Sequence, residues 1–350
     1  MVNELPLSWE RVSLNNAADF FVARTLHNES GIPSVLLSGH IDTVFPPSLG
    51  QYDASVENEI IKGPGSQDML GGVMVMIETM RRLNNEGKLK NLVIALSPEE
   101  EIVTPNHRPT IEKLSNEVTY VMVFEPESID SSDYTPYVKS LTRSRRGGGK
   151  YSISFTGPGG HSGELSQKQD RNSCNIAAAK MVVGIEEKIS DYAQGTTLNI
   201  GLMNGGEQFN VISPSASLVG EFRCKSQQEY SRVIQKLTQM TSDVSGHNIR
   251  GSFNLDAGAP PLVHTKKSAE FMNLIHKVAQ RLGVTIVEQD KTGVSEANLY
   301  MAANPDLSVI DGFGVVGGGE HTQDSEYAYI RSITDSTILA TEIIKELQGI

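Results

Sequence analysis

The 350-residue sequence contains one tryptophan, two cysteines and no apolar run that approaches the roughly 20 residues needed to span a bilayer. Membrane insertion is therefore not expected. Cys174 and Cys224 lie far apart and lack CxxC spacing, so neither a disulfide framework nor a cysteine zinc site is expected, and both are predicted to be core thiols. The N-terminus also lacks the basic and apolar regions of a signal peptide, which predicts a cytoplasmic protein.

Positive charge is scarce as well. The chain has 30 lysines and arginines against 42 aspartates and glutamates, which gives a formal net charge of −12. Such a surface repels phosphate backbones, so we expect no nucleic-acid partner. One basic cluster stands out, formed by Arg143, Arg145 and Arg146. We favour a solvated loop for it, and the alternative is a site that captures a substrate's carboxylate.

The length predicts two domains, and the pattern of the sequence changes twice along the chain. In residues 1–145, and again in 259–350, short apolar strands alternate with helices, which is typical of an α/β domain. Residues 146–258 follow the order βαββαβ, the split pattern of a small α+β domain. We therefore predict one α/β domain built from both ends of the chain, with residues 146–258 inserted after a glycine hinge at 146–149.

Apolar periodicity places the individual elements. In the outer domain it predicts strands at 35–37, 91–96, 120–124, 284–287 and 307–310, and helices at 72–83, 269–282, 296–302 and 334–347. In the insertion it predicts strands at 151–155, 196–203, 216–224 and 249–255, and helices at 172–189 and 227–240. Residues 128–144 are predicted to be a polar break without a strand.

Histidine or acidic residues follow three of the predicted strands at the point where each ends. They are His40 with Asp42, the triplet Glu99–Glu101, and Glu125. Because sites in parallel α/β sheets form at the carboxyl ends of strands, these groups lie where a site is expected. Asp42 is suited to accept a hydrogen bond from the second ring N–H of a metal-bound His40. The alternative is that His40 and Asp42 lie in a surface turn.

Two of the acidic motifs also have structural explanations. Asp68 lies among glycines before a predicted helix, where it has close access to a cation, and the alternative is an N-cap. The triplet Glu99–Glu101 suits one metal ligand beside one general base, and the alternative is an exposed acidic loop. His321, in a glycine-flanked loop, supplies a second imidazole. Mixed histidine and carboxylate ligation suits zinc, with cobalt or manganese as substitutes.

These motifs resemble those of the zinc exopeptidase and deacylase family that includes acetylornithine deacetylase, succinyl-diaminopimelate desuccinylase and bacterial glutamate carboxypeptidase, with the last the most similar. The resemblance extends from about Pro33 to the C-terminus. It implies two zinc ions, one bound by His40 and Glu125 and the other by Glu101 and His321, with Asp68 shared between them.

The resemblance also assigns catalytic roles. Glu100 would be the general base and Asp42 the residue that orients His40. A shift of one residue, which would make Glu99 the base and Glu100 the ligand, stays open. The implied fold is an α/β catalytic domain, with a mixed sheet flanked by helices, into which a ferredoxin-like α+β lid and dimerisation domain is inserted.

Further residues are implied to lie near the substrate. His161, in the segment 157–163, resembles a lid histidine that reaches the active site of the partner subunit in a homodimer, and the alternative is a turn histidine. Asn210 and Arg223 resemble other lid residues. Gly293 is the last candidate, in a segment where the family's Gly-Gly-Thr-Asp-Ala is replaced by Gly-Val-Ser-Glu-Ala.

The sequence departs from the family elsewhere too. Leu70 replaces a usual lysine, the N-terminal helices are shortened or absent, and no arginine stands near 258–260, so specificity for glutamate is not implied. We expect a two-zinc hydrolase that releases a free amino acid from an N-acyl-amino acid or short peptide. The alternatives are a di- or tripeptide aminopeptidase and a non-catalytic binding protein.

Two other patterns are set aside. Gly312, Gly314 and Gly317 have the spacing of a dinucleotide fingerprint but no following helix, so a flexible loop that presents His321 is predicted instead. His107 is predicted to lie in a surface turn.

Overall fold

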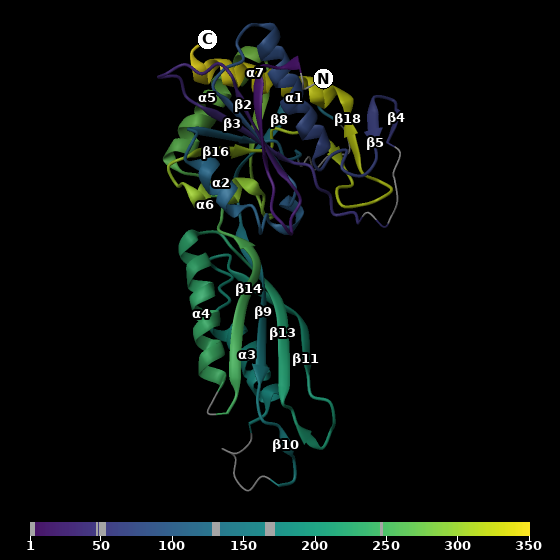
Figure 1. Ribbon diagram of the computed structural model, residues 1–350, viewed down its shortest axis with the longest axis vertical. Helices are drawn as coiled ribbons and strands as arrows, with labels where there is room; N and C mark the ends of the chain where they lie inside the picture. Colours follow the sequence, from purple (N-terminus) through teal and green to yellow (C-terminus); the bar gives the residue numbers. More distant parts are fainter. Residues whose placement is uncertain (1–3, 47, 49–53, 128–133, 165–171, 246–247) are drawn as a thin grey trace. The chain divides into compact units, whose positions relative to one another are not determined.

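The computed structural model describes residues 4–46, 48, 54–127, 134–164, 172–245 and 248–350. The chain forms two compact units (Figure 1). The first, here called the sheet unit, comprises Met1–Arg145, Leu262–Lys291 and Ser295–Ile350. The second, the inserted unit, comprises Arg146–Pro261 and Thr292–Val294. None of the helices in the described part of the chain is both long and apolar enough to cross a membrane.

An eight-stranded sheet organises the sheet unit, in the order β1-β2-β6-β3-β7-β16-β8-β15. The strands are β1 Leu7–Val12, β2 Phe20–Thr25, β3 Val35–His40, β6 Leu92–Ser97, β7 Tyr120–Val123, β8 Val138–Arg145, β15 Thr285–Lys291 and β16 Ser308–Asp311. The four central strands, β6, β3, β7 and β16, are parallel, while β2 is antiparallel to β6 and β8 to β16. The predicted α/β class with a mixed sheet is confirmed.

Among the described residues, the sheet unit has the α-helices α1 Leu70–Asn85, α2 Arg108–Ser115, α5 Lys266–Leu282, α6 Glu296–Ala303 and α7 Ile330–Gln348. Its main core joins apolar side chains of the strands with those of α1, α5 and α7. Every residue of β3 is buried, since the strand is central and covered on both faces, and this explains why it reads as a continuous apolar run. The sheet unit also contains a small sheet of strand order β17-β18-β5-β4, formed by β17 Gly317–Gly318, β18 Tyr327–Tyr329, β5 Ile60–Lys62 and β4 Ser55–Glu57.

The inserted unit has a four-stranded antiparallel sheet of order β11-β13-β9-β14. Its elements are β9 Gly147–Thr156, α3 Cys174–Lys188, β11 Thr197–Gly205, β13 Ser215–Cys224, α4 Gln227–Ser245 and β14 Arg250–Ala259, with a short pair of β10 Gly160–His161 and β12 Val211–Ile212. This is the predicted ferredoxin-like βαββαβ unit (Figure 1). Its core includes Cys174 and Cys224 as free buried thiols, as expected.

The prediction of a polar break at 128–144 is wrong over its second half, because β8 occupies Val138–Arg145. Residues 128–133 lie outside the described part. The solvated loop predicted for the basic cluster is also wrong for Arg143 and Arg145, which lie on β8. Their guanidinium groups are paired across the sheet, Arg143 with Asp290 and Glu288, and buried Arg145 with Asp311 at 2.6 Å. Polar residues matched by partners on other strands hide a strand from a search for apolar periodicity.

The glycine hinge predicted at 146–149 is likewise part of a strand, since Gly147–Gly149 begin β9. Glycine is needed there because a Cβ on Gly148 would lie 2.1 Å from the carbonyl oxygen of Phe222. Three elements were not predicted from the sequence. Strands β1 and β2 lie before the first predicted strand, and helix α2 lies between the predicted strands at 91–96 and 120–124.

Candidate metal centre

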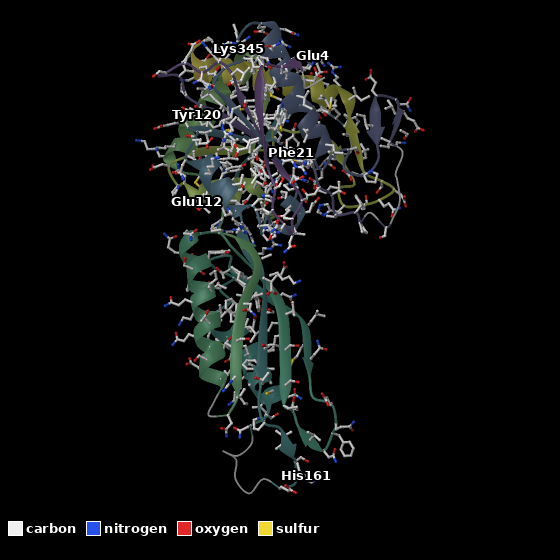
Figure 2. The ribbon with its side chains drawn as sticks, viewed as in Figure 1. Glu4, Phe21, Glu112, Tyr120, His161 and Lys345 are labelled. Atoms are coloured by element: carbon white, nitrogen blue, oxygen red, sulfur yellow. The ribbon has the colours of Figure 1, made fainter. Side chains whose placement is uncertain are left out.

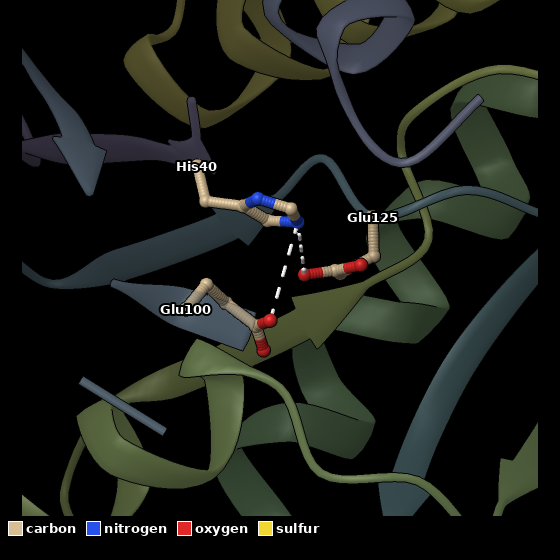
Figure 3. A group of neighbouring side chains, drawn as sticks. All are labelled: His40, Glu100 and Glu125. Carbon is tan, nitrogen blue, oxygen red and sulfur yellow. Dashed lines mark ion pairs between the residues drawn. The ribbon is translucent and has the colours of Figure 1, made fainter. Parts of the chain in front are cut away.

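Three neighbouring parallel strands deliver polar groups to one edge of the sheet. His40 is the last residue of β3, Glu125 follows the end of β7, and Glu100 and Glu101 begin a 3-10 helix, η3 Glu100–Ile102, that follows β6. Figure 3 shows the His40 imidazole facing the carboxylates of Glu100 and Glu125. The Nε2 atom of His40 lies 4.0 Å from Oε2 of Glu100 and 3.9 Å from Oε1 of Glu125.

Asp68 and His321 reach this edge from loops. Asp68 precedes α1, and His321 lies between β17 and β18. The two oxygens of Asp68 face different imidazoles: Oδ1 lies 3.0 Å from Nε2 of His40, and Oδ2 lies 3.2 Å from Nε2 of His321. Nε2 of His321 is also 3.3 Å from Oε2 of Glu101. The structure thus brings together all five residues predicted as metal ligands, around one central carboxylate.

The surroundings fit a pair of cations. Oε1 of Glu125 is buried and has no hydrogen-bond partner among the described residues. Burial, with the charge of Asp68 adding to it, raises the pKa of Glu125 to about 8 and that of Glu101 to about 7. Burial and the charge of Glu125 raise the pKa of Glu100 well above its usual range. Carboxylates crowded in this way repel one another unless cations lie between them.

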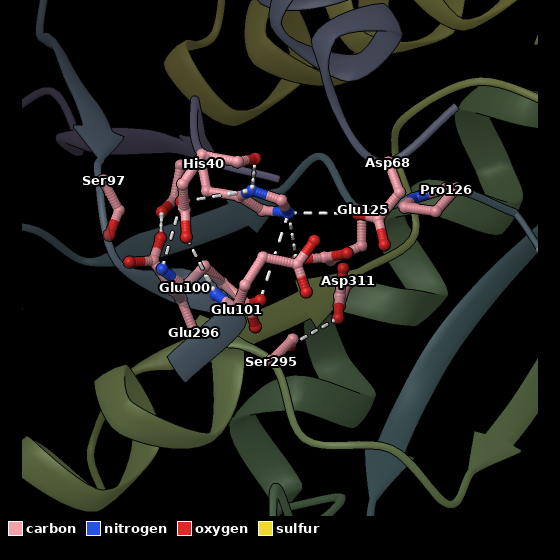
Figure 4. A network of polar contacts seen from close by, with 12 residues as sticks. His40, Asp68, Ser97, Glu100, Glu101, Glu125, Pro126, Ser295, Glu296 and Asp311 are labelled. Carbon is pink, nitrogen blue, oxygen red and sulfur yellow. Dashed lines mark hydrogen bonds and ion pairs between the residues drawn. The ribbon is translucent and has the colours of Figure 1, made fainter. Parts of the chain in front are cut away.

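Asp42 joins His40 to Glu100 and Glu101, which lie around the His40 ring in Figure 4. The ring Nδ1 of His40 lies 3.0 Å from the carbonyl oxygen of Asp42, which fixes Nδ1 as the protonated nitrogen and leaves Nε2 to bind a cation. The Asp42 carboxylate accepts hydrogen bonds from the backbone N–H groups of Glu100 and Glu101, at 3.2 and 3.1 Å. The surface-turn alternative for His40 is wrong, since the side chain is buried.

The contacts of the two acidic motifs argue against an N-cap role for Asp68 and against an exposed acidic loop at Glu99–Glu101. The N-cap residue of α1 is Met69, without a side-chain hydrogen bond, so Asp68 does not cap the helix. Glu99 is buried, and both of its oxygens accept hydrogen bonds from Asn106, at 3.2 and 2.7 Å. Glu99 therefore already has its partners, whereas Glu100 and Glu101 face His40 and His321.

Glu326 has a structural role that the sequence did not reveal. Its carboxylate is buried and accepts hydrogen bonds from the backbone N–H groups of Gly65, Gln67 and Asp68, at 2.8, 2.9 and 3.0 Å. It thereby fixes the loop that carries Asp68. The only signal in the sequence was its position five residues after His321.

A second buried carboxylate, Glu296, lies behind the centre. Its oxygens accept hydrogen bonds from Ser38 at 2.9 Å and Thr104 at 3.4 Å, which ties α6 to the segments before His40 and after Glu101. The sequence marked this position only as a departure from the family pattern.

The remaining predicted residues belong to the inserted unit. His161 is exposed on β10 (Figure 2), and the adjacent Ser162 donates its backbone N–H to the carbonyl oxygen of Asn210 at 3.1 Å, so these two candidates lie together. Arg223 is near the other end of β13 from them, paired in the sheet with Gly148, and its guanidinium contacts Glu221. Gly293 lies in the short segment Thr292–Val294. These four residues therefore belong to a different unit from the metal-ligand candidates, which are all in the sheet unit.

Two predictions about other segments are wrong. Residues 312–316 are buried, and the backbone N–H of Gly314 donates to the carbonyl oxygen of Glu125 at 3.0 Å, so this segment supports Glu125 and is not a flexible loop. His107 is fully buried and contacts the carbonyl oxygen of Ala18 at 2.8 Å. Ala18 lies in the N-terminal segment, where no helix or strand was predicted from the sequence.

Comparison with known proteins identifies the family. The family model described as "Peptidase family M20/M25/M40" matches residues 36–346. The chain belongs to this family. The match covers both units and confirms the resemblance inferred from the motifs.

Individual relatives are distant. Carboxypeptidase G2 of Pseudomonas sp. (strain RS-16) is 24% identical over 329 residues, covering 91% of this chain and 74% of that protein. A probable succinyl-diaminopimelate desuccinylase of Staphylococcus aureus (strain MSSA476) is 25% identical, covering 79% and 74%.

Solved structures share the fold. Aminopeptidase PepT from Bacillus cereus ATCC 10987 has a TM-score of 0.74 at 17% identity, over 99% of this chain and 90% of that one. The Bacillus subtilis YXEP protein, described as a dinuclear metal-binding peptidase of family M20, has a TM-score of 0.67 at 15% identity, over 97% and 88%. The chain is therefore an enzyme of a metallopeptidase family that hydrolyses amide bonds, and the non-catalytic alternative is set aside.

The raised carboxylate pKa values predict how pH affects the metal-free protein. Above about pH 4.5 the folded chain retains a proton on Glu101 up to about pH 7, and one on Glu125 up to about pH 8, which the unfolded chain has lost, so stability falls as pH rises. Although burial lowers the pKa of His40, its bonds to Asp42 and Asp68 raise it well above normal, and the stability it contributes is also lost as pH rises.

Bound cations would remove this penalty. The unfolding temperature of the metal-free protein should therefore fall from pH 5 to pH 8, and the gap to the zinc-loaded protein should widen over the same range. Calorimetry of both forms measures the gap, and a gap that stays constant or narrows would contradict the assignment of these carboxylates to a metal centre.

Proposed function

We propose that this enzyme is a co-catalytic dizinc hydrolase that releases a free amino acid from an N-acyl-amino acid or a short peptide. The observation that carries the proposal is the central position of Asp68, whose two oxygens lie 3.0 and 3.2 Å from the Nε2 atoms of His40 and His321. A carboxylate placed between two imidazoles in this way suits a ligand that bridges two cations. Zinc is the preferred cation because the donors mix histidine and carboxylate.

The contacts support one division of the ligands. His40 and Glu125, 3.9 Å apart, would hold one cation, and Glu101 and His321, 3.3 Å apart, would hold the other, with Asp68 shared. Asp68 has the electrostatic character of such a ligand: despite its burial, the neighbouring His40 and His321 lower its pKa, so that it remains ionised.

Glu100 is the proposed general base. Two divalent cations, when bound, polarise the scissile carbonyl and make the attacking water more acidic. The Glu100 carboxylate lies with His40 and Glu125, its Oε2 4.0 Å from Nε2 of His40, and would accept the proton of the attacking water. It would then pass that proton to the nitrogen of the leaving amine, which departs as a free amino acid.

His161 is proposed to stabilise the developing oxyanion in the active site of a partner subunit, within a homodimer formed through the inserted unit. Its Nδ1 accepts a hydrogen bond from the backbone N–H of Gly163 at 3.1 Å, which places the ring proton on Nε2. Among the described residues, no acceptor lies against the exposed Nε2–H, which is therefore open to the contact that an oxyanion requires. Asn210 and Gly293 are proposed to contact the substrate. Arg223 is proposed for the same role, although it lies away from Asn210 along β13.

Substrate profiling tests the proposed activity. Protein stripped by a chelator should hydrolyse nothing, and readdition of zinc or cobalt should restore hydrolysis of N-acyl-amino acids or of peptides at their C-terminal bond. Release of free amino acid, followed by chromatography, is the measurement. Full activity in a demonstrably metal-free sample would refute the metal mechanism. Exclusive activity on peptides with a free amino terminus would instead establish the aminopeptidase alternative.

The acidic triplet offers a matched set of variants for the base. Glu100→Gln should retain two zinc ions per chain while kcat falls by about 10²–10⁴, as is typical when a general base is lost. Glu101→Gln should lose zinc. Glu99→Gln, which alters only the contacts with Asn106, should retain zinc and most of kcat.

Zinc content by mass spectrometry and steady-state kinetics read out all three variants. If Glu99→Gln abolishes turnover with zinc retained, and Glu100→Gln loses zinc, the roles are shifted by one residue.

Mixing two inactive variants tests the role of His161. His161→Ala should lower kcat by about 10²-fold without loss of zinc, because one oxyanion donor is removed. If His161 acts across a dimer, a heterodimer of His161→Ala with Glu100→Gln has one site with both lesions and one with neither. Activity should therefore reappear after subunit exchange. Full activity of wild-type protein that sedimentation shows to be strictly monomeric would rule this out.

A further inference from the structure

Three apolar side chains remain exposed directly beside the metal centre. Ile41, Leu70 and Ile102 each lie within two residues of a proposed ligand, and their exposed fractions are 38%, 42% and 57%. Single exposed apolar residues are common on protein surfaces and need no explanation. These three are different because the segments that carry them meet at one site.

Hydrogen bonds hold the segments of Ile41 and Ile102 together. Asp42, which follows Ile41, accepts hydrogen bonds through its carboxylate from two backbone N–H groups of η3. The donors are Glu100 at 3.2 Å and Glu101 at 3.1 Å, and Ile102 is the next residue. The two exposed isoleucines therefore belong to adjoining segments.

Leu70 lies against the same region from the other side of the centre. It is the first residue of α1, and its backbone N–H donates to the carbonyl oxygen of Gly65 at 2.9 Å. A Cβ added to Gly65 would lie 3.3 Å from Cδ1 of Leu70 and 3.0 Å from Cγ2 of Thr43. The side chains of Leu70 and Thr43 thus lie close together over Gly65, between the loop of Asp68 and the segment that follows His40.

The apolar character of this position is a property of this chain, since Leu70 replaces a usual lysine of the family. A lysine would present a cation two residues from Asp68, whereas leucine offers no hydrogen-bonding group. Covering its exposed surface is favourable when the covering group is itself apolar. A substrate that reaches the metal centre passes beside these side chains, so its own apolar groups are suited to cover them.

We propose that Leu70, together with Ile41 and Ile102, forms an apolar rim that selects substrates with an aliphatic group next to the scissile amide. This inference rests on the proposed amide hydrolysis and narrows it to one class of substrate. The aliphatic group belongs either to the acyl part or to the side chain of the released amino acid, and two series of substrates separate these cases.

In the first series the acyl chain lengthens from acetyl to hexanoyl on a constant L-alanine. In the second series N-acetyl is constant and the side chain lengthens from alanine to norleucine. Affinity should rise in at least one series by about 2–4-fold per methylene, as expected for the burial of apolar surface. Calorimetry on zinc-loaded protein that carries Glu100→Gln measures this gain without turnover, and kcat/KM of the active protein should follow it.

Matched variants at Leu70 identify the source of the gain. Leu70→Asn, which is similar in size but polar, should reduce it to less than about 1.5-fold per methylene with zinc content unchanged. Leu70→Met, which is again apolar, should retain it. Leu26→Asn is the control: Leu26 is 61% exposed and follows β2, which is antiparallel to β6, so it lies at the opposite edge of the sheet from η3. This variant should retain the full gain.

The proposal is overturned if neither series shows a gain, if the gain survives Leu70→Asn, or if Leu70→Asn weakens all chain lengths equally. Failure of the proposed function has a different signature. Zinc-loaded wild-type protein would then hydrolyse no N-acyl-amino acid or peptide, while calorimetry would still report whether affinity rises with chain length.

Discussion

The crowding of four carboxylates at one buried edge of a sheet is the constraint on which the rest of the structure depends. Asp68, Glu100, Glu101 and Glu125 converge around two imidazoles, in a place where burial and the neighbouring negative charges raise the pKa of Glu100, Glu101 and Glu125. Such an arrangement is costly without cations and stable with them. The fold around it holds the groups at fixed positions so that they cannot move apart.

Backbone amides supply much of that support. Asp42 binds the N–H groups that begin η3, and Glu326 binds three N–H groups of the loop that carries Asp68. The segment 312–316 packs beneath Glu125. The site is thus held by carboxylates outside the proposed ligand set, and their removal would loosen the proposed ligands without changing the donor set.

The sequence predicted the parts of this arrangement that are local. Strands buried on both faces, such as β3, appear as apolar runs, and the residues at their ends follow directly from the pattern. The antiparallel sheet of the inserted unit was also predictable, because one face is apolar and the residues alternate. The sequence did not reveal β8, whose arginines are matched by acids on neighbouring strands, or the roles of Glu296 and Glu326. Those roles depend on contacts between residues more than 160 positions apart, which no local pattern records.

The central claim is that Asp68 bridges two cations, and anomalous diffraction from crystals of the zinc-loaded protein tests it most directly. The account predicts two zinc peaks per chain, about 3.5–4 Å apart, each next to a different oxygen of Asp68. One peak shared by His40 and Glu125 is expected, and the other by His321 and Glu101. A single peak, or two peaks of which neither contacts Asp68, would contradict it.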